Sequence, residues 1–200
     1  MLSEGLHDVP EGMVANVVTH LQMLDPPAER PVPDQPDLSL APIDTSDLDA
    51  YRALFRHVGQ DWLWFGRLRK SEGELREILE DPAYEAFALE LDGQAQGLLE
   101  LDFRQPGHCE LGYFGLGPGL IGRGAGRWLM AEAIRRAWRP GVNRFWVHTC
   151  TLDSPQALMF YVRSGFTPFR QEVEVAPDPR LTGDLPRDAA PQFPIIEPAP

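Results

Sequence analysis

The chain has 200 residues, of which 43% are hydrophobic and 24% are charged, and this composition is ordinary for one globular domain and small for two. Its formal net charge of -12 argues against unspecific binding to nucleic acid or to an anionic membrane, and no stretch is apolar enough for a transmembrane helix. The N-terminus carries the early acidic residues Glu4 and Asp8 and does not resemble a secretory signal. The cysteines, Cys109 and Cys150, give neither a disulfide framework nor metal-ligand spacing. We therefore expect a cytoplasmic protein without a metal.

Proline content divides the chain into three regions. Residues 1–36 hold one strand-like run, Met13 to Leu24, and a linker rich in proline. Residues 37–176 have the patterns of a continuous folded domain, and residues 177–200 form a proline-rich tail for which we expect no regular structure. We expect the run at 13–24 to cover an edge of the sheet or to pair with a second subunit. The second arrangement would make the protein a homodimer.

Apolar spacing and turn signals predict the elements of the domain. In chain order they are a strand at 38–40, a helix from about 46, a helix from 71, strands at 84–91, 94–103 and 108–116, a helix to about 139, a strand at 144–150, a helix at 154–165 and a strand at 166–175. Ser71 and Glu74 have capping-box spacing, and Asp92-Gly93 is a hairpin signal. Ser154, followed by proline, is expected to cap the last helix. The order β-α-α-β-β-β-α-β-α-β indicates an α/β domain with a mixed, mostly antiparallel sheet and an extra N-terminal strand.

The stretch GLIGRGAGRWLM places Gly122, Gly124 and Gly126 directly before a helical pattern. The start of a helix presents unpaired backbone N–H groups and the positive end of the helix dipole, which together bind phosphate. Residues without side chains let an anion approach these groups closely. The stretch lacks the Gly-Lys-Ser/Thr of a P-loop and the spacing of a dinucleotide-binding turn. It therefore predicts another kind of phosphate cradle, or else a tight turn without a ligand.

The order of elements, together with IGRGAG before the third helix and SPQALMFYVRSGF in the fourth, resembles the GNAT superfamily of acetyl-CoA-dependent N-acetyltransferases. The resemblance covers about residues 38–175 and implies a splayed sheet with acetyl-CoA as cosubstrate. Gly124 and Gly126 fill the two glycine positions of the family's pyrophosphate loop, whereas Ile121 stands where Gln or Arg is usual. The resemblance assigns the binding of acetyl-CoA to Phe114, Leu116, Ile121, Gly122, Arg123, Gly124, Ala125, Gly126 and Arg127.

The resemblance also implies catalytic roles. Glu110 has the spacing before Ile121 at which histone-modifying members carry a glutamate base, so we expect it to deprotonate the amine directly or through water; the alternative is an edge carboxylate paired with an arginine. Tyr161 matches the tyrosine that acts as general acid near the thioester sulfur, although it could simply pack in the helix. His148 is a second candidate base, because its unperturbed pKa lies near neutrality. Neither cysteine is placed as an acyl-carrying nucleophile, which favours direct transfer in a ternary complex.

Three aromatic residues between the first two helices, Trp62, Trp64 and Phe65, are expected to wall the acceptor site, by resemblance, or to pack in the core. Such a wall could attract an ammonium group through cation–π contacts. We expect the acceptor to be a primary amine of a small molecule or peptide, and neither nucleic acid nor a membrane to be a partner. Two alternatives remain open. One is a non-catalytic acyl-CoA-binding sensor or adaptor on the same fold, and the other is a nucleotide-binding fold with a parallel sheet.

Overall fold

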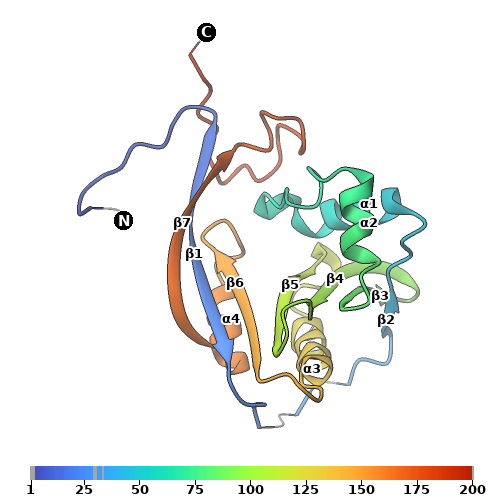
Figure 1. The fold of residues 1–200 in the computed structure, drawn as a ribbon. Coiled ribbons are helices and arrows are strands. Elements are labelled where there is room, and N and C mark those ends of the chain that lie inside the picture. The colour runs from blue at the N-terminus through green and yellow to red at the C-terminus, as the bar shows by residue number, and fades with distance from the viewer. Residues whose placement is uncertain (1–2, 29–30, 33, 200) are drawn as a thin grey trace.

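The computed structural model describes residues 3–28, 31–32 and 34–199. Its elements follow one another in the order shown in Figure 1. They are β1 (Met13–Met23), β2 (Leu38–Pro42), α1 (Leu48–Gly59), η1 (Gln60–Trp62), α2 (Glu72–Leu79), β3 (Tyr84–Leu91), β4 (Gln94–Asp102), β5 (His108–Leu116), η2 (Pro118–Leu120), α3 (Ala125–Ala137), β6 (Arg144–Cys150), α4 (Ala157–Ser164) and β7 (Thr167–Pro177).

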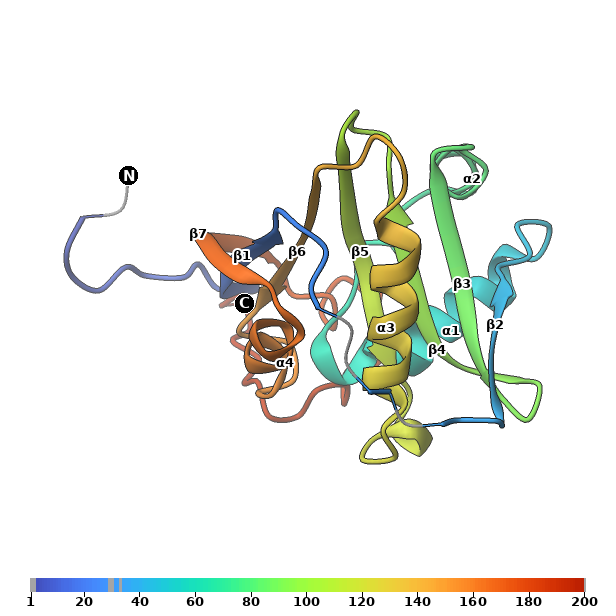
Figure 2. The same cartoon turned by 90° about the horizontal axis from the view of Figure 1, so that it is seen from below.

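The seven strands form one open sheet in the order β2-β3-β4-β5-β6-β1-β7. Neighbouring strands run antiparallel except β5 and β6, which are parallel. Helices α1 and α2 cover one face, and α3 and α4 cover the other (Figures 1 and 2). Successive side chains of the central strand β4 therefore enter different cores. Leu98 belongs to the core under α1 and α2, and its neighbour Leu99 belongs to the core under α3. The mixed, mostly antiparallel α/β sheet predicted from the sequence is confirmed, and a parallel nucleotide-binding sheet is excluded.

Local signals place the elements as the sequence predicts. Ser71 and Glu74 form a complete capping box at the start of α2. The β3–β4 hairpin turns at Asp92 and Gly93, which have φ values of 51° and 75°, so a glycine suits the turn. The helix predicted to be capped by Ser154 instead begins at Ala157, because the Ser-Pro dipeptide forms a turn before it.

The N-terminal strand lies inside the sheet rather than at its edge. Strand β1 pairs with β6 through Val18–Met23 and with β7 through Met13–Gln22. Both of its backbone edges are therefore used within the chain, and Leu21 and Met23 enter the core. The expectation that this strand covers an edge or pairs with a second subunit is wrong.

Residues 178–199 contain neither helix nor strand, but they pack firmly against the domain. Asp178 and Arg180 form an ion pair that is almost fully buried, with the carboxylate 2.7 Å from the guanidinium. Arg180 also donates to the carbonyl of Phe193 at 2.8 Å. This segment contributes to a third hydrophobic cluster, made of Val14, Leu63, Leu152, Leu185, Ala189 and Ala190. The tail therefore supports the segment between α1 and α2, where Leu63 lies.

Candidate active site

Strands β5 and β6 diverge part-way along their length. They pair only where His108–Leu111 meets Arg144–Val147, although both strands lie wholly within the described residues. Beyond that point β5 continues beside β4, and β6 continues beside β1 (Figure 2). The register of β4 and β5 shifts by one residue at Gly112, which is a β-bulge that bends β5 away from β6. Over residues 112–116, one backbone edge of β5 therefore has no neighbouring strand within the described part of the chain.

A cavity of about 480 Å³ occupies this divergence. It brings together most of the residues that the sequence singled out, from four separate parts of the chain. The predicted residues that line it are Trp62, Trp64, Phe65, Phe114, Leu116, Ile121, Gly122, Gly124, Gly126, Arg127 and Tyr161. Three others do not line it: the side chain of Arg123 is exposed, Ala125 is only 1% exposed in the core, and Glu110 lies elsewhere.

The glycine-rich loop takes a conformation that requires glycine. Gly122 and Gly124 have φ values of 81° and 85°, in the left-handed region that residues with a Cβ rarely adopt. Gly124 caps α3, and its carbonyl accepts the first helical hydrogen bond, from the amide of Trp128 at 3.2 Å. The amide of Arg127 donates to the same carbonyl at 3.1 Å, which leaves the amides of Ala125 and Gly126 available at the positive end of the helix dipole, beside the exposed cation of Arg127. This arrangement suits a pyrophosphate group.

Tyr161 lies on α4, lines the cavity and is 7% exposed. Its ring packs edge-on against Phe114 and Phe166, with centroids 6.2 Å and 5.9 Å away. Burial, together with the negative charge of Asp153, raises the pKa of the phenol well above its ordinary value. Tyr161 therefore stays protonated at neutral pH and is able to donate a hydrogen bond.

Glu110 contacts the main cavity through His148. Its Oε1 lies 3.3 Å from His148 Nδ1, and His148, with a side chain 46% exposed, lines the cavity. This hydrogen bond raises the pKa of His148 against the opposing effect of burial, and the charges of Glu110, Asp153 and Glu174 add to it. The structure thus pairs Glu110 with a histidine rather than with an arginine.

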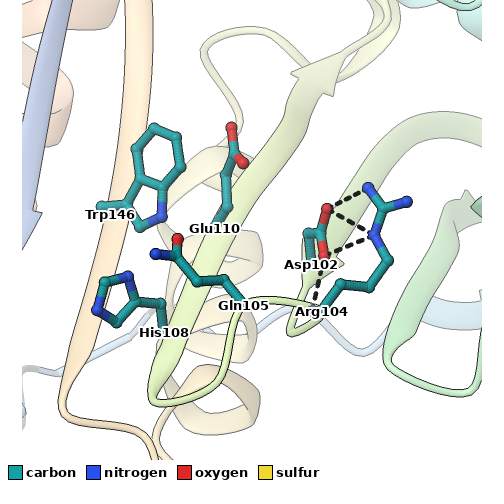
Figure 3. Close-up of a pocket in the computed structure, with 6 residues that line it drawn as sticks. All are labelled: Asp102, Arg104, Gln105, His108, Glu110 and Trp146. Carbon is teal, nitrogen blue, oxygen red and sulfur yellow. Dashed lines mark hydrogen bonds and ion pairs between the residues drawn. The ribbon is translucent and has the colours of Figure 1, made fainter.

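Glu110 itself lines a separate cavity of about 350 Å³, at the end of the sheet where β4, β5 and β6 meet. Figure 3 shows its side chain between Trp146 and Asp102. Arg104 in the same cavity is bound to Asp102, with 2.5 Å between Nη2 and Oδ2. The nearest titratable partner of Glu110 is therefore His148, which the sequence presented only as a second candidate base.

The aromatic segment after α1 lines the cavity and also packs against the core. Trp64 packs against Phe55 and Tyr113 with ring centroids 5.5 Å and 5.2 Å away, and its indole nitrogen donates to Asp153 at 3.1 Å. A Cβ on Gly115 of β5 would lie 2.8 Å from the Trp64 ring, so only glycine allows this approach. Trp64 is therefore a core residue with one face on the cavity.

A buried ionic network fixes the same segment, and its partners could not be identified from the sequence. Glu100 on β4 is 0% exposed and accepts hydrogen bonds from Arg67 at 2.8 Å and Tyr51 at 2.5 Å, as well as from Tyr84. Arg67 lies two residues after Phe65, and its guanidinium lies 5.0 Å from the centre of the Tyr113 ring. The network therefore ties the wall of the cavity to the centre of the sheet. The only signal available was a glutamate within an apolar strand.

A sequence model described as "Acetyltransferase (GNAT) family" matches residues 50–166, which is more than half of the chain. The chain belongs to the GNAT acetyltransferase family. No functionally curated protein matches the sequence. The matched region includes β5, the glycine-rich loop and α4, whereas β1 and β7 lie outside it.

Solved structures of GNAT proteins share the fold at low sequence identity. A GCN5-related N-acetyltransferase from Sphaerobacter thermophilus has a TM-score of 0.58 and 17% identity; the match covers 82% of this chain but only 51% of that protein. An acetyltransferase from Thermus thermophilus gives 0.52 and 20%, with 70% and 97% covered. A point mutant of the spermidine N-acetyltransferase SpeG from Vibrio cholerae gives 0.55 and 17%, with 74% and 98% covered. These likenesses establish the GNAT fold.

Two further observations bear on the chemistry of this GNAT site. Among the described residues, no group of three or more His, Cys, Asp and Glu side chains is arranged to hold a metal ion. Cys150 lines the cavity, but burial and the nearby charge of Asp153 raise the pKa of its thiol to about 12, so it is not a thiolate at neutral pH.

None of the helices in the described ranges is long and apolar enough to cross a membrane.

Proposed function

We propose that the protein transfers the acetyl group of acetyl-CoA to a primary amine, by direct attack in a ternary complex. The observation that carries this proposal is the cavity between the diverging β5 and β6, which joins the glycine-rich loop to Tyr161 and His148. When bound, acetyl-CoA supplies an acetyl group activated as a thioester. The raised pKa of the Cys150 thiol supports direct transfer, because the thiol is a poor nucleophile in its protonated form.

The residues present fit acetyl-CoA at two places. Backbone amides at the start of α3, with Arg127, would hold the pyrophosphate. The unpaired edge of β5 at residues 112–116 offers backbone N–H and C=O groups to the pantetheine arm, in the way that an added strand pairs with a sheet. Phe114 and Leu116 lie on this edge and line the cavity, as do Ile121, Gly122, Gly124 and Gly126 of the loop.

Removal of the amine proton falls to His148, with Glu110 as its positioning residue. Since Nδ1 faces the Glu110 carboxylate, it carries the proton, and Nε2 is left as the basic nitrogen. A general base of this kind typically contributes about 10² to 10⁴ in rate. This assignment modifies the expectation that Glu110 acts directly, because His148 and not Glu110 lines the main cavity.

Tyr161 would stabilise the departing sulfur. Its raised pKa keeps the phenol neutral, so the O–H can donate a hydrogen bond as negative charge develops in the transition state. Trp62, Trp64 and Phe65 form an aromatic wall for the amine. The spermidine acetyltransferase among the structural neighbours acts on an amine by its name, which agrees with this class of acceptor.

The test is release of the CoA thiol from acetyl-CoA across a panel of primary amines. We expect turnover with at least one amine and an approximately 10² to 10⁴-fold lower kcat for His148→Gln. His7→Gln is the control, because His7 is exposed and does not line the cavity. Acetyl-CoA binding without thiol release for any amine would overturn the proposal and support the acyl-CoA-binding sensor instead.

A further inference from the structure

Asn16 on β1 and Glu174 on β7 lie directly opposite each other in the sheet, and both line the main cavity. Neither belongs to residues 50–166, the part of the chain that the family model matches. Residues of opposite strands that pair in this way project from the same face. The cavity therefore has a wall that the two strands outside the family match build together.

The side chain of Asn16 has an unsatisfied acceptor. Asn16 is 4% exposed, and its Nδ2 donates to Glu174 Oε2 at 3.0 Å. This bond fixes the orientation of the amide, because the reverse orientation would set two oxygens against each other. The buried Oδ1 is left without a hydrogen-bond partner among the described residues. A ligand that brings an N–H donor would satisfy it, since buried polar atoms are rarely left unpaired.

The charge around this pair favours a cation. Asp153, the other carboxylate of the cavity, is already engaged by Trp64, by the hydroxyl of Thr149 at 2.7 Å and by the amide of Cys150 at 2.9 Å. Glu174 is exposed and is held only at Oε2, by Asn16, in the contacts described. The arginines that line the cavity, Arg127 and Arg163, belong to α3 and α4. These two helices lie on the opposite face of the sheet from α1 and α2.

The pair is separated from the base by about four residues of strand. His148 lies opposite His20 on β1, and Asn16 lies four positions along the same strand, on the same face. At about 3.3 Å per residue, these levels are roughly 13 Å apart along β1. Val18, which also lines the cavity, lies between them. One molecule bound at both places would thus need two polar ends joined by an apolar chain.

We propose that Asn16 and Glu174 form a subsite for a second ammonium group of the acceptor, so that the substrate is a diamine or longer polyamine. The inference rests on the proposed function, and it names the substrate class of that site. The distal ammonium donates to Asn16 Oδ1 and pairs with the Glu174 carboxylate, while the other amine group lies at His148 to be acetylated. The subsite thereby selects dications over simple alkylamines.

The test compares linear diamines from 1,3-diaminopropane to 1,8-diaminooctane with monoamines of the same length, by thiol release. For the longer members we expect kcat/KM to be at least about tenfold higher for the diamine, because a lone alkyl end leaves Asn16 Oδ1 without a donor and the Glu174 carboxylate without a cation. Glu174→Gln should bring the ratio close to one, and Asn16→Ala should lower it. Glu172→Gln is the matched control, because Glu172 is on the same strand, pairs with His20 at 2.7 Å and does not line the cavity. Glu174 is exposed, so its substitution leaves the fold intact.

A second measurement does not depend on turnover. Calorimetric titration of 1,6-diaminohexane into protein saturated with CoA should show binding that Glu174→Gln loses and Glu172→Gln retains. Equal kcat/KM for diamines and monoamines, or unchanged diamine binding in Glu174→Gln, would overturn the subsite. Diamine binding that depends on Glu174 without thiol release from any amine would support the subsite and refute the proposed function.

Discussion

The buried network around Glu100 makes a quantitative prediction for Glu100→Gln. Glu100 is fully buried, and the side chain of its partner Arg67 is only 10% exposed. Gln has nearly the same shape but no charge, so the guanidinium remains buried without its counter-ion. It also replaces one oxygen acceptor with an N–H donor, in a place where Tyr51 and Tyr84 both need an acceptor.

Removing one partner of a buried ion pair typically destabilises a protein by about 3–5 kcal/mol. For a chain of this size, each kcal/mol lowers the melting temperature by roughly 2–4 °C. We therefore expect Glu100→Gln to melt roughly 6–20 °C below the wild type. Because Arg67 anchors the segment that carries Trp64, the KM for the amine should also rise.

Urea unfolding followed by tryptophan fluorescence measures the free energy of unfolding directly. Glu80→Gln is the control, because its ion pair with Arg76 is half exposed and is worth at most about 1 kcal/mol. If Glu100→Gln unfolded within about 1 kcal/mol of the wild type, the reasoning that the network anchors the cavity wall would be refuted.

Four further substitutions test the proposed base, the proposed acid and the packing of the glycines. The raised pKa of His148 means that the neutral imidazole, which is the base, predominates only at pH values above that pKa. Glu110→Gln should therefore shift the inflection of the kcat/KM profile to lower pH and reduce kcat by about 10–100-fold. An unmoved inflection would contradict the pairing of Glu110 with His148. Tyr161→Phe should lower kcat in thiol release by about 10²- to 10³-fold while the Kd of acetyl-CoA stays the same. An intact maximal rate would show that the tyrosine only packs. Gly115→Ala should lower the free energy of unfolding in urea by about 1–3 kcal/mol, because the new Cβ would lie 2.4 Å from Val58. Gly73→Ala in α2 meets open space and should raise the free energy of unfolding by about 0.4–1 kcal/mol. Equal effects of the two substitutions would refute the packing argument.

The sequence predicts the elements well where local physics decides them. The capping box at Ser71 and the turn at Asp92 depend on neighbours a few residues away, and both are found. The loop at Gly122 and Gly124 could be recognised for the same reason, since both glycines take a positive φ directly before α3 and set the local backbone without help from the rest of the chain. The position of β1 could not be predicted, because alternating apolar residues suit any place in a sheet, and pairing with β6 joins residues far apart in the chain.

The same limit applies to the site. Glu110 and His148 were each singled out, but their contact depends on the register of the parallel β5–β6 pair, in which Glu110 lies opposite Trp146. The roles of Glu100 and Asn16 depend on contacts with Arg67 and Glu174 respectively, which sequence spacing does not encode. Site features that depend on residues within one element could therefore be predicted from the sequence. Features that depend on contacts between strands could not.

In the reaction that we propose, the glycine-rich loop and the diverging strands bind acetyl-CoA. Calorimetric titration of the purified protein with acetyl-CoA, with ATP and NAD as controls, measures this binding without any need for the acceptor. We expect binding of acetyl-CoA in the micromolar range and none of either control. Absence of acetyl-CoA binding by a protein shown to be folded, or equal binding of ATP, would contradict it.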